Sequence, residues 1–456
     1  MESLANFIEN SGGRLYTFQY PSNIFKGKYC PSNTTCAWFN DRLIVNSRLV
    51  DYIKIFQNSE INVTGRNLSQ DYIYTEDGFN SRNILSICSN GELLNSRECI
   101  YPSNKRINAY YKGLEDCRLV VWNNKLYAYG TRWDRRPDKG CICIYELDND
   151  MKPFNEIVVP PQNGSTNCEK NWGAVSDKPF TFVYQNNPLT VVRVERNGAC
   201  RLICERDYNE KLGTIKGSTQ VVRFNEDTYI SMVHKNDYYD DNGFKRSDYL
   251  TAFVFYDNDL NIKRISDWFV FNSPMCEFTC GLAINGNDVF ITYSQLDCTS
   301  QLLVTTKEVI ENFITHLQYS KNNNTKNVFE YMGLAGLSES NNQNNTALCL
   351  YNYTATLFGE DGFYSMFKKD CLIKTYCGII KRAPSFKDKN VYNNIKNNLE
   401  HFVEKYPDCC EFYYLLSLIC KMMGDMDNYT KYKEMGDKYK LSMNKWFFKY
   451  FNPNYL

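Results

Sequence analysis

Between residues 14 and 304, the chain alternates short apolar runs, rich in β-branched and aromatic residues, with polar turns. Such runs are typical of β-strands, and pairs of them separated by Asn, Asp or Gly are typical of hairpins. The pattern predicts hairpins at Leu119–Tyr129, Phe180–Val194, Val221–Val233, Leu250–Ile262 and Leu282–Tyr293. No helical pattern lies between them, which argues against a parallel α/β sheet and favours a sandwich, a barrel or a propeller. Their spacing is irregular and does not by itself select the propeller.

After Val304 the pattern changes to helical periodicity. Apolar residues of Thr305–Ile314 recur at helical spacing and predict a helix, whereas Asn322–Asn345 is polar and predicts a loose linker. From Val391 onward we expect three helices, of which the first ends at Pro407. The order of helix, Pro, helix, Gly-Asp and helix resembles a tetratricopeptide-type hairpin. A plain helical cap on the sheet domain is the alternative interpretation.

Charge excludes some classes of partner. The chain has 52 basic and 52 acidic residues among 456, so it has no basic field for a nucleic-acid backbone or an anionic membrane. Aromatic residues make up 15%, and 35 of them are Tyr, a residue that suits sheet surfaces and sugar-binding clefts. The abundance of Tyr, Asn, Lys and Ile is also typical of an AT-rich genome, which accounts for most of this excess.

The 19 cysteines are scattered, and the N-terminus lacks a basic segment followed by an apolar run. We therefore expect a cytoplasmic protein with reduced thiols, in a virus-infected or protist cell. The pairs Cys141/Cys143 and Cys409/Cys410 lack further ligands at zinc-site spacing, so we expect no metal. No stretch approaches the ~20 apolar residues that span a bilayer.

One cluster of charged residues precedes the first predicted hairpin. Glu115 and Asp116 are adjacent carboxylates in the segment Gly113–Leu119, and Arg118 follows two residues later. Strand alternation predicts that Asp116 and Arg118 share a face and that Glu115 faces away. A guanidinium keeps a neighbouring carboxylate ionised unless the carboxylate is desolvated. From the residues alone, the pair either positions a ligand or is a structural salt bridge, and base rates favour the salt bridge.

The segment Gly113-Leu-Glu-Asp-Cys-Arg-Leu119 resembles the Glu-Asp-Pro-Arg signature of glycoside hydrolase family 130, which contains β-mannoside phosphorylases and some mannosidases on a five-bladed propeller. Further segments resemble the family in its order along the chain. They are Tyr29–Ser32 with Arg48, Glu169–Trp172, Gly217–Ser218 with His234 and Tyr249, and Glu277–Gly281 with Tyr293 and Asp297. The likeness covers residues 29–303.

The resemblance implies roles. Asp116 would be the general acid, acting on the glycosidic oxygen partly through a substrate hydroxyl, while phosphate attacks from the opposite face. Arg48 and Asp297 would hold the reactive sugar, and Glu277 is the formal candidate for the base of a hydrolase. Lys170, His234 and Tyr249 would line the side of the nucleophile. The remaining implied substrate-binding residues are Ser32, Glu115, Arg118 and Asn171.

The chain departs from the family signature at several positions. Cys117 replaces the signature Pro and Cys30 replaces an Asn, while Tyr184-Gln185 replaces a His-Arg pair. Lys216 stands where an Arg is common. Because Arg forks recognise phosphate best, these losses weigh against phosphorolysis more than against sugar binding.

The predicted fold is mainly β: a five-bladed β-propeller at residues 1–310, a helix with an Asn-rich linker at 311–350, and a helical, tetratricopeptide-like region at 351–456. The predicted function is cleavage or formation of a β-mannoside-like bond with inversion. The alternatives are a nucleotide-sugar-dependent mannosyltransferase and a non-catalytic glycan- or protein-binding scaffold. We expect an oligosaccharide or glycan substrate and no cofactor, with inorganic phosphate as an optional co-substrate. The C-terminal helices could recruit a protein partner.

Overall fold

The computed structural model describes residues 3–21, 24, 29–75, 79–102, 111–136, 139–162, 168–208, 215–273, 275–317, 328–358, 363–440, 443 and 447. Contacts divide the chain into two compact units. The first, the propeller unit, comprises residues 1–51, 79–237 and 248–326. The second, the helical unit, comprises residues 52–78, 238–247 and 327–456.

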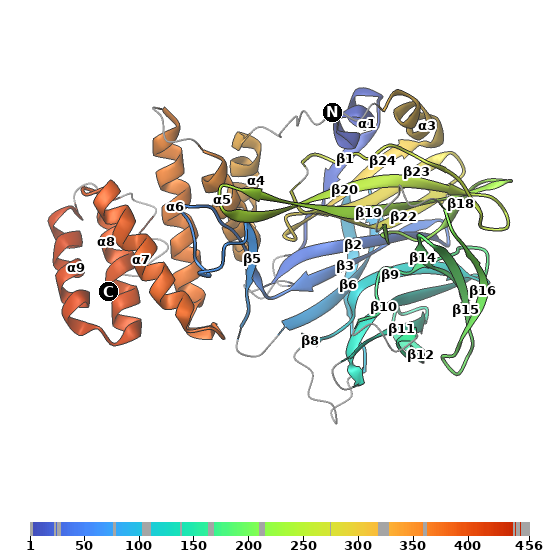
Figure 1. Cartoon of the computed structure of the whole chain (residues 1–456), viewed down its shortest axis with the longest axis horizontal. Coiled ribbons are helices and arrows are strands. Elements are labelled where there is room, and N and C mark those ends of the chain that lie inside the picture. Colours follow the sequence, from blue (N-terminus) through green and yellow to red (C-terminus); the bar gives the residue numbers. More distant parts are fainter. Residues whose placement is uncertain are drawn as a thin grey trace. The chain divides into compact units, whose positions relative to one another are not determined.

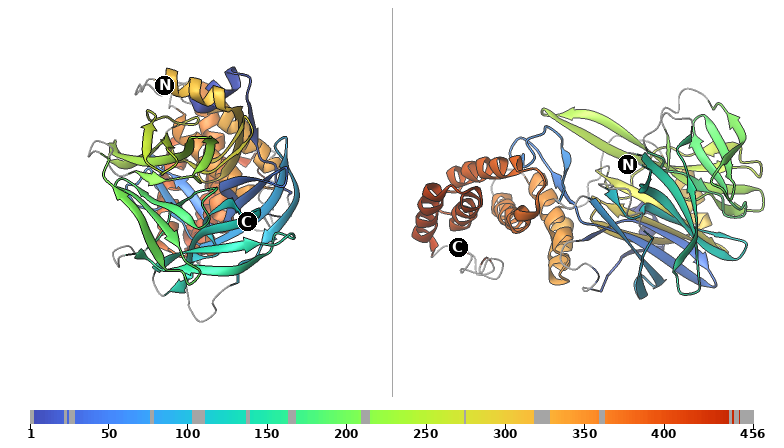
Figure 2. Two further views of the ribbon diagram at one scale, coloured as in Figure 1. Left: turned by 90° about the vertical axis from the view of Figure 1, so that its right-hand side faces the viewer. Right: turned by 90° about the horizontal axis from the view of Figure 1, so that it is seen from below.

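The described residues of the propeller unit form five sheets of mainly antiparallel strands, which confirms the predicted five-bladed β-propeller (Figures 1 and 2). Blade 1 contains β2 (Cys30–Phe39), β3 (Arg42–Val50), β6 (Phe79–Ser89), β7 (Glu92–Cys99) and the short β8 (Tyr111–Lys112). Blade 2 contains β9 (Glu115–Trp122), β10 (Lys125–Arg136), β11 (Lys139–Leu147) and β12 (Pro153–Val159). Blade 3 contains β13 (Gly173–Ala174), β14 (Thr181–Asn186), β15 (Leu189–Val194) and β16 (Cys200–Arg206).

The last two blades complete the ring. Blade 4 contains β17 (Lys216–Gly217), β18 (Val222–Asn225), β19 (Thr228–Asp241), β20 (Phe244–Tyr256) and β21 (Ile262–Ile265). Blade 5 contains β22 (Glu277–Asn285), β23 (Asp288–Gln295), β24 (Thr299–Thr306) and, from the other end of the chain, β1 (Arg14–Thr17). Because Arg14 pairs with Val304 and Thr17 with Gln301, backbone hydrogen bonds close the ring between its first and last strands.

Apolar side chains fill the spaces between neighbouring blades. One such buried cluster joins blades 2 and 3. It contains Trp122 of β9, Phe182 of β14 and Trp172, which directly precedes β13. Both tryptophans are only 1% exposed. They therefore pack between blades, as expected for large rings in a propeller core, and are not free to stack on a sugar.

One side chain, Gln220, joins four blades at the hub. It lies between β17 and β18 of blade 4 and is 2% exposed. Its Nε2 donates to the carbonyl oxygens of Cys36 in β2, at 2.7 Å, and of Leu119 in β9, at 2.6 Å. Its Oε1 accepts from the backbone N–H of Leu282 in β22, at 3.2 Å. In the described sheets β2, β9 and β22 are end strands, so this amide supplies part of the hydrogen bonding that holds the hub together.

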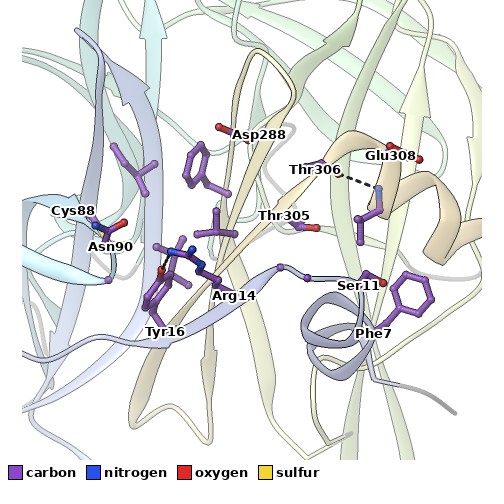
Figure 3. Close-up of a pocket in the computed structure, with 18 of the residues that line it drawn as sticks. Phe7, Ser11, Arg14, Tyr16, Cys88, Asn90, Asp288, Thr305, Thr306 and Glu308 are labelled. Atoms are coloured by element: carbon purple, nitrogen blue, oxygen red, sulfur yellow. Dashed lines mark hydrogen bonds between the residues drawn. The ribbon is translucent and has the colours of Figure 1, made fainter.

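A cavity of about 730 Å³ lies where blade 5 meets blade 1 (Figure 3). Arg14 and Tyr16 of β1 and Phe290 of β23 line it from blade 5, while Trp38 and Leu43 line it from blade 1. The Trp38 and Phe290 rings stack with centroids 5.4 Å apart. Ring closure therefore leaves an open wedge beside the β1–β24 pair.

Helices α1 (Leu4–Asn10) and α3 (Lys307–His316) belong to the propeller unit. The second confirms the helix expected at Thr305–Ile314, and its N-cap is Thr306, whose side chain accepts from the N–H of Val309. The helical unit contains α4 (Val328–Ser340), α5 (Asn344–Leu357), α6 (Phe363–Arg382), η3 (Ala383–Ser385), α7 (Asn390–Lys405), α8 (Cys410–Met423) and α9 (Met426–Lys438). The last three are the helices predicted after Val391, while the tetratricopeptide likeness stays a prediction. Among the described residues, no helix is long and apolar enough to cross a membrane.

Two expectations about organisation differ from the structure. Residues 328–340, expected in a loose linker, form α4, because the buried Tyr331 and Ala335 pack within the helical unit. The rest of the expected linker before residue 328 lies outside the described residues. Residues 52–78 and 238–247, expected in the propeller, group with the helical unit. They include β4 (Ile53–Phe56) and β5 (Gln70–Ile73), and Phe56 exchanges two hydrogen bonds with the side chain of Asn352 in α5.

We predict that Gln220→Met lowers the free energy of unfolding of the propeller unit by about 3 kcal/mol, because it removes the partner of two carbonyl groups and one N–H at a buried position. Denaturant unfolding monitored by circular dichroism measures this change. Gln185→Met is the matched control, because Gln185 is exposed and its substitution should cost less than about 0.5 kcal/mol. Equal unfolding midpoints for the two variants would contradict the role of Gln220.

Candidate functional site

A β-bulge at the start of β9 sets the direction of Asp116. The pairing of β9 with β10 shifts by one residue, so Asp116 and Cys117 lie opposite the single Gly130. Asp116 takes a φ of 49°, in the left-handed region that residues other than Gly rarely adopt. A Cβ on Gly130 would lie 2.5 Å from the carbonyl oxygen of Glu115. The bulge therefore needs a glycine on the partner strand, and it turns Asp116 out of the ordinary strand alternation.

Two other inner strands have comparable bulges. In β2, Asn33 and Thr34 lie opposite the single Ser47, and Asn33 has a φ of 44°. In β22, Cys280 is the additional residue. Bulges re-aim side chains and are common next to active sites. Three of the five blades thus have an irregular inner strand near the same hub network.

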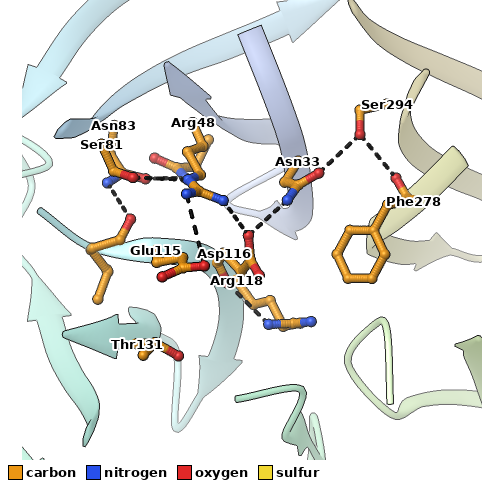
Figure 4. Close-up of polar contacts among 12 residues, drawn as sticks. Asn33, Arg48, Ser81, Asn83, Glu115, Asp116, Arg118, Thr131, Phe278 and Ser294 are labelled. Carbon is orange, nitrogen blue, oxygen red and sulfur yellow. Dashed lines mark hydrogen bonds and ion pairs between the residues drawn. The ribbon is translucent and has the colours of Figure 1, made fainter. Parts of the chain in front are cut away.

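The carboxylate of Asp116 is the centre of this network (Figure 4). Its Oδ1 accepts from Nη1 of Arg48 at 2.6 Å and from Nδ2 of Asn33 at 2.7 Å. Arg48 also donates from Nε to Ser81 Oγ at 2.9 Å, and Asn33 accepts from Ser294 Oγ at 2.9 Å. Within the described part of the chain, Asp116 Oδ2 receives no hydrogen bond, and the side chain is 10% exposed. The protein therefore holds this carboxylate through one of its two oxygens.

The expectation that Glu115 faces away from Asp116 is wrong. Its Oε1 lies 3.9 Å from Nη2 of Arg48, so one guanidinium faces both carboxylates. The physical reason is the bulge, which interrupts the alternation on which the expectation rested. The other oxygen of Glu115, Oε2, accepts from the indole Nε1 of Trp133 at 3.1 Å.

Arg118 binds backbone rather than the carboxylate of Asp116. Its Nη1 donates to the carbonyl oxygen of Asp116 at 3.0 Å, and its Nε donates to the carbonyl oxygen of Ser218 at 2.6 Å. Nη2 is buried and has no hydrogen-bond partner among the described residues. The guanidinium therefore links blade 2 to blade 4 and keeps one unused donor in the hub.

Blade 4 brings His234 to the other end of this link. Its Nδ1 lies 2.7 Å from Ser218 Oγ, and its ring stacks on Tyr249 with centroids 6.2 Å apart. Burial, and then the positive charges of Lys216 and Arg118, lower the pKa of His234 to about 3. The imidazole is therefore neutral at physiological pH and acts as a polar, uncharged group.

Two lysines approach each other next to His234. Burial, followed by the charge of Lys170, lowers the pKa of Lys216. Lys170 is exposed by surface area; desolvation by its surroundings opposes the charged form, but the carboxylates of Asp116 and Glu115 raise its pKa overall. The backbone explains the proximity, because Asn171 has a φ of 66° and its carbonyl oxygen would lie 2.3 Å from a Cβ on Gly217. Only a glycine after Lys216 allows this approach.

Other predicted site residues also reach the hub. The charges of Arg118, Asp116, Arg48 and Asp297 all act on the buried thiol of Cys280, although burial is the main reason that its pKa is raised to about 12. Asp297 has a φ of 53° and is 9% exposed. Ser32, another predicted site residue, lies opposite Arg48 in the β2–β3 strand pair. Its buried hydroxyl has no hydrogen-bond partner among the described residues.

Glu277 has a different position from the rest. Its carboxylate accepts from the backbone N–H groups of Phe271, Asn272 and Ser273 and from Nε2 of Gln295. Burial raises the pKa of Glu277 to about 7, against the effect of these donors. With four donors on its two oxygens, this carboxylate holds the 271–273 turn and has little capacity left to activate water.

Sequence reasoning did not assign a role in the site to Asn33. Asn33 joins Asp116 of blade 2 to Ser294 of blade 5. The available signal was a polar amide directly after Tyr29–Ser32, the segment that the family resemblance placed on the first blade. Its left-handed backbone and its partners, 83 and 261 residues away, have no local signature.

No protein-family model matches the chain, and no curated protein matches its sequence. Among solved structures, the fold is similar to a β-1,2-mannobiose phosphorylase from Listeria innocua, with 9% identity over 66% of this chain and 99% of that one, at a TM-score of 0.43. It is also similar to a structure described under family 130 hydrolases that target β-1,2-mannosidic linkages in Candida mannan. The identity is 11% over 61% of this chain and 85% of that one, and the TM-score is 0.39. A family 43 endo-arabinanase from Bacillus licheniformis is similar as well, with 11% identity over 64% of this chain and 96% of that one, at a TM-score of 0.34. At these values the likenesses carry no argument about chemistry.

The charge on Asp116 is set by its neighbours. Burial would raise its pKa, but the charge of Arg48, with smaller contributions from other cations and the Asn33 amide, holds the pKa of Asp116 below its ordinary value. Asp116 is therefore ionised at neutral pH and accepts hydrogen bonds from hydroxyl groups.

We predict that Asp116→Asn lowers the free energy of unfolding by about 3 kcal/mol at pH 7, because it leaves Arg48 without its buried partner. Since the folded pKa of Asp116 is depressed, its stabilising effect is present above the unfolded pKa and is lost as the pH falls through the folded value. The gap between the wild-type protein and the variant should therefore shrink below about pH 4. Denaturant titrations from pH 3 to 7 measure it, with exposed Asp227→Asn as the control. A gap that stays constant with pH would contradict the ion pair.

Proposed function

We propose that the protein is a carbohydrate-active enzyme that breaks or forms a β-mannoside-like glycosidic bond with inversion, with Asp116 as the general acid. The observation that carries the proposal is the division of the hub into two parts. The carboxylate of Asp116, whose side chain is 10% exposed, is fixed through one oxygen, and Lys216, Lys170 and Arg118, which make no ion pair within 4.0 Å among the described residues, lie on the side of His234.

The first part suits a sugar. Asp116 Oδ2 is available for a hydroxyl hydrogen bond, and Arg48 holds the carboxylate rigidly through Oδ1. Asp297 adds a second carboxylate whose charge reaches the same buried thiol as Arg48 and Asp116. Pre-positioned carboxylates next to a guanidinium orient the vicinal hydroxyls of a pyranose, which is the role that the family resemblance assigns to these positions.

The second part suits an anion. Lys170 has no hydrogen-bond partner among the described residues, and Lys216 has only a 3.5 Å contact with Asn236 Oδ1. The unused Nη2 of Arg118 is a further donor. Burial, and then the charge of Lys170, lower the pKa of Lys216, and an anion bound beside the two lysines would favour the charged form of Lys216. This arrangement supports inorganic phosphate as the co-substrate, even though lysines stand where the family more often has arginine.

The chemistry follows from the two parts. In cleavage, protonated Asp116 gives its proton to the glycosidic oxygen, in part through a sugar hydroxyl, and the bond from that oxygen to the anomeric carbon breaks. A phosphate oxygen forms the new bond from the opposite face, which inverts the anomeric centre. In synthesis, the Asp116 carboxylate takes the proton of the acceptor hydroxyl while phosphate leaves. Because the free carboxylate is ionised, it starts in the form that synthesis needs.

We predict that the protein releases sugar from β-linked mannosyl oligosaccharides only when phosphate is present, and that Asp116→Asn lowers this rate by at least about 100-fold while the variant stays folded. Sugar and sugar-phosphate release are measured by chromatography, with and without phosphate and with a nucleotide sugar as an alternative donor. Release without phosphate would favour a hydrolase, and transfer from the nucleotide sugar would favour a mannosyltransferase. An active Asp116→Asn variant would show that another group is the acid, and inactivity on every sugar would favour a binding scaffold.

We predict that Lys216→Met and Lys170→Met each raise the KM for phosphate by about tenfold or more, because each removes one charged donor to the anion. The KM for the sugar should change less than threefold. The matched control is Lys263→Met, since Lys263 is exposed on β21. An unchanged KM for phosphate in both site variants would contradict the anion site.

A further inference from the structure

We propose that Tyr111 and Trp133 form an aromatic subsite for the second sugar ring, the one on the leaving-group or acceptor side of the scissile bond. This inference rests on the proposed function and specifies its substrate as an oligosaccharide whose second residue is a neutral pyranose. Neither the family resemblance nor the hub contacts of Asp116 assign a role to these two residues.

Contacts along the chain place the two rings together. Tyr111 belongs to β8, which pairs in parallel with β6 so that Tyr111 lies opposite Phe79. The Tyr111 and Trp133 rings have centroids 5.1 Å apart and an interplanar angle of 33°. The Phe79 ring contacts the Tyr111 ring edge-on, with centroids 5.1 Å apart and an interplanar angle of 62°, and Phe79 is only 6% exposed. Tyr111 and Trp133 are themselves partly exposed, so they supply the accessible aromatic surface.

Hydrogen bonds tie this surface to the acid. The indole Nε1 of Trp133 donates to Glu115 Oε2, and Glu115 shares the guanidinium of Arg48 with Asp116. Arg48 in turn lies 5.2 Å from the centroid of the Phe79 ring. The aromatic pair is thus separated from Asp116 by a single carboxylate and a single guanidinium, and all of these groups are fixed by contacts with one another.

The chemistry of this corner matches a neutral pyranose. Rings of Tyr and Trp offer an apolar face to the C–H groups of a sugar and a polar edge to its hydroxyls. Glu115 Oε1 accepts no hydrogen bond from the described residues, and the Glu115 side chain is 20% exposed, so it can accept from a sugar hydroxyl. Burial, and then the charge of Glu115, raise the pKa of Tyr111, whereas the charge of Lys170 lowers it. A few convergent polar groups around an aromatic surface are typical of small-ligand sites.

The test compares binding of mannose and of a β-linked mannobiose by isothermal titration calorimetry. We expect the wild-type protein to bind the disaccharide at least about tenfold more tightly than the monosaccharide. Trp133→Ala should remove most of this difference and leave the affinity for mannose within twofold. Trp133→Phe should keep part of it, because it retains a ring but loses the hydrogen bond to Glu115. Trp268→Ala is the matched control, since Trp268 is also partly exposed but packs under Lys235.

Disaccharide affinity that is equal in the wild-type protein and Trp133→Ala would overturn the subsite, as would a wild-type protein that prefers mannose. If Trp133→Ala does not fold, Tyr111→Leu provides the same comparison, with circular dichroism as the check on folding. Binding separates this inference from the proposed function. A Trp133-dependent preference for the disaccharide without any bond cleavage supports the subsite and refutes the enzyme, whereas cleavage without that preference refutes the subsite alone.

Discussion

The missing side chain of Gly130 is the constraint on which the hub network depends. Without a Cβ at this position, β10 can approach the carbonyl oxygen of Glu115, and β9 can take one residue more than its partner. That additional residue allows Asp116 to adopt a left-handed backbone and to share Arg48 with Glu115. A regular strand would alternate these two carboxylates between opposite faces and leave the guanidinium with one of them. The local strain is thus compensated by an ion pair of 2.6 Å and by the Asn33 amide.

One cation of the hub, Arg118, is held by backbone groups instead of by a carboxylate. Arg118 could have paired with the carboxylate of Asp116, but it binds two carbonyl oxygens, one in each of two blades. The carboxylate is consequently left to Arg48, and the positive charge of Arg118 contributes to the field that keeps His234 neutral. The described part of the hub therefore contains one carboxylate paired with a guanidinium, Asp116 with Arg48, and a second guanidinium, Arg118, that is bound to carbonyl oxygens.

Much of the fold could be predicted from the sequence, because hairpins depend on local alternation and on turn residues. The strands on either side of Asn123-Asn124 and the helix after Thr306 are examples. Asp116 and Arg48 were found through a motif, and the structure brings them together. The predicted orientation of Glu115 was wrong because the strand contains a bulge, and that bulge depends on a glycine in another strand. Gln220 was missed because its partners, such as Cys36, lie up to 184 residues away, and no local pattern encodes a contact of that range.

The closure of the ring by β1 has a consequence for biosynthesis. Residues 14–17 emerge from the ribosome before their pairing partners, residues 301–304, which are made nearly three hundred codons later. During this interval the nascent first strand has no edge to join, and blade 5 is incomplete. Long-range pairing of this kind slows folding and exposes unpaired backbone. Residues 14–17, a short and partly apolar segment, must therefore stay unpaired with their final partner until the fifth blade has been translated.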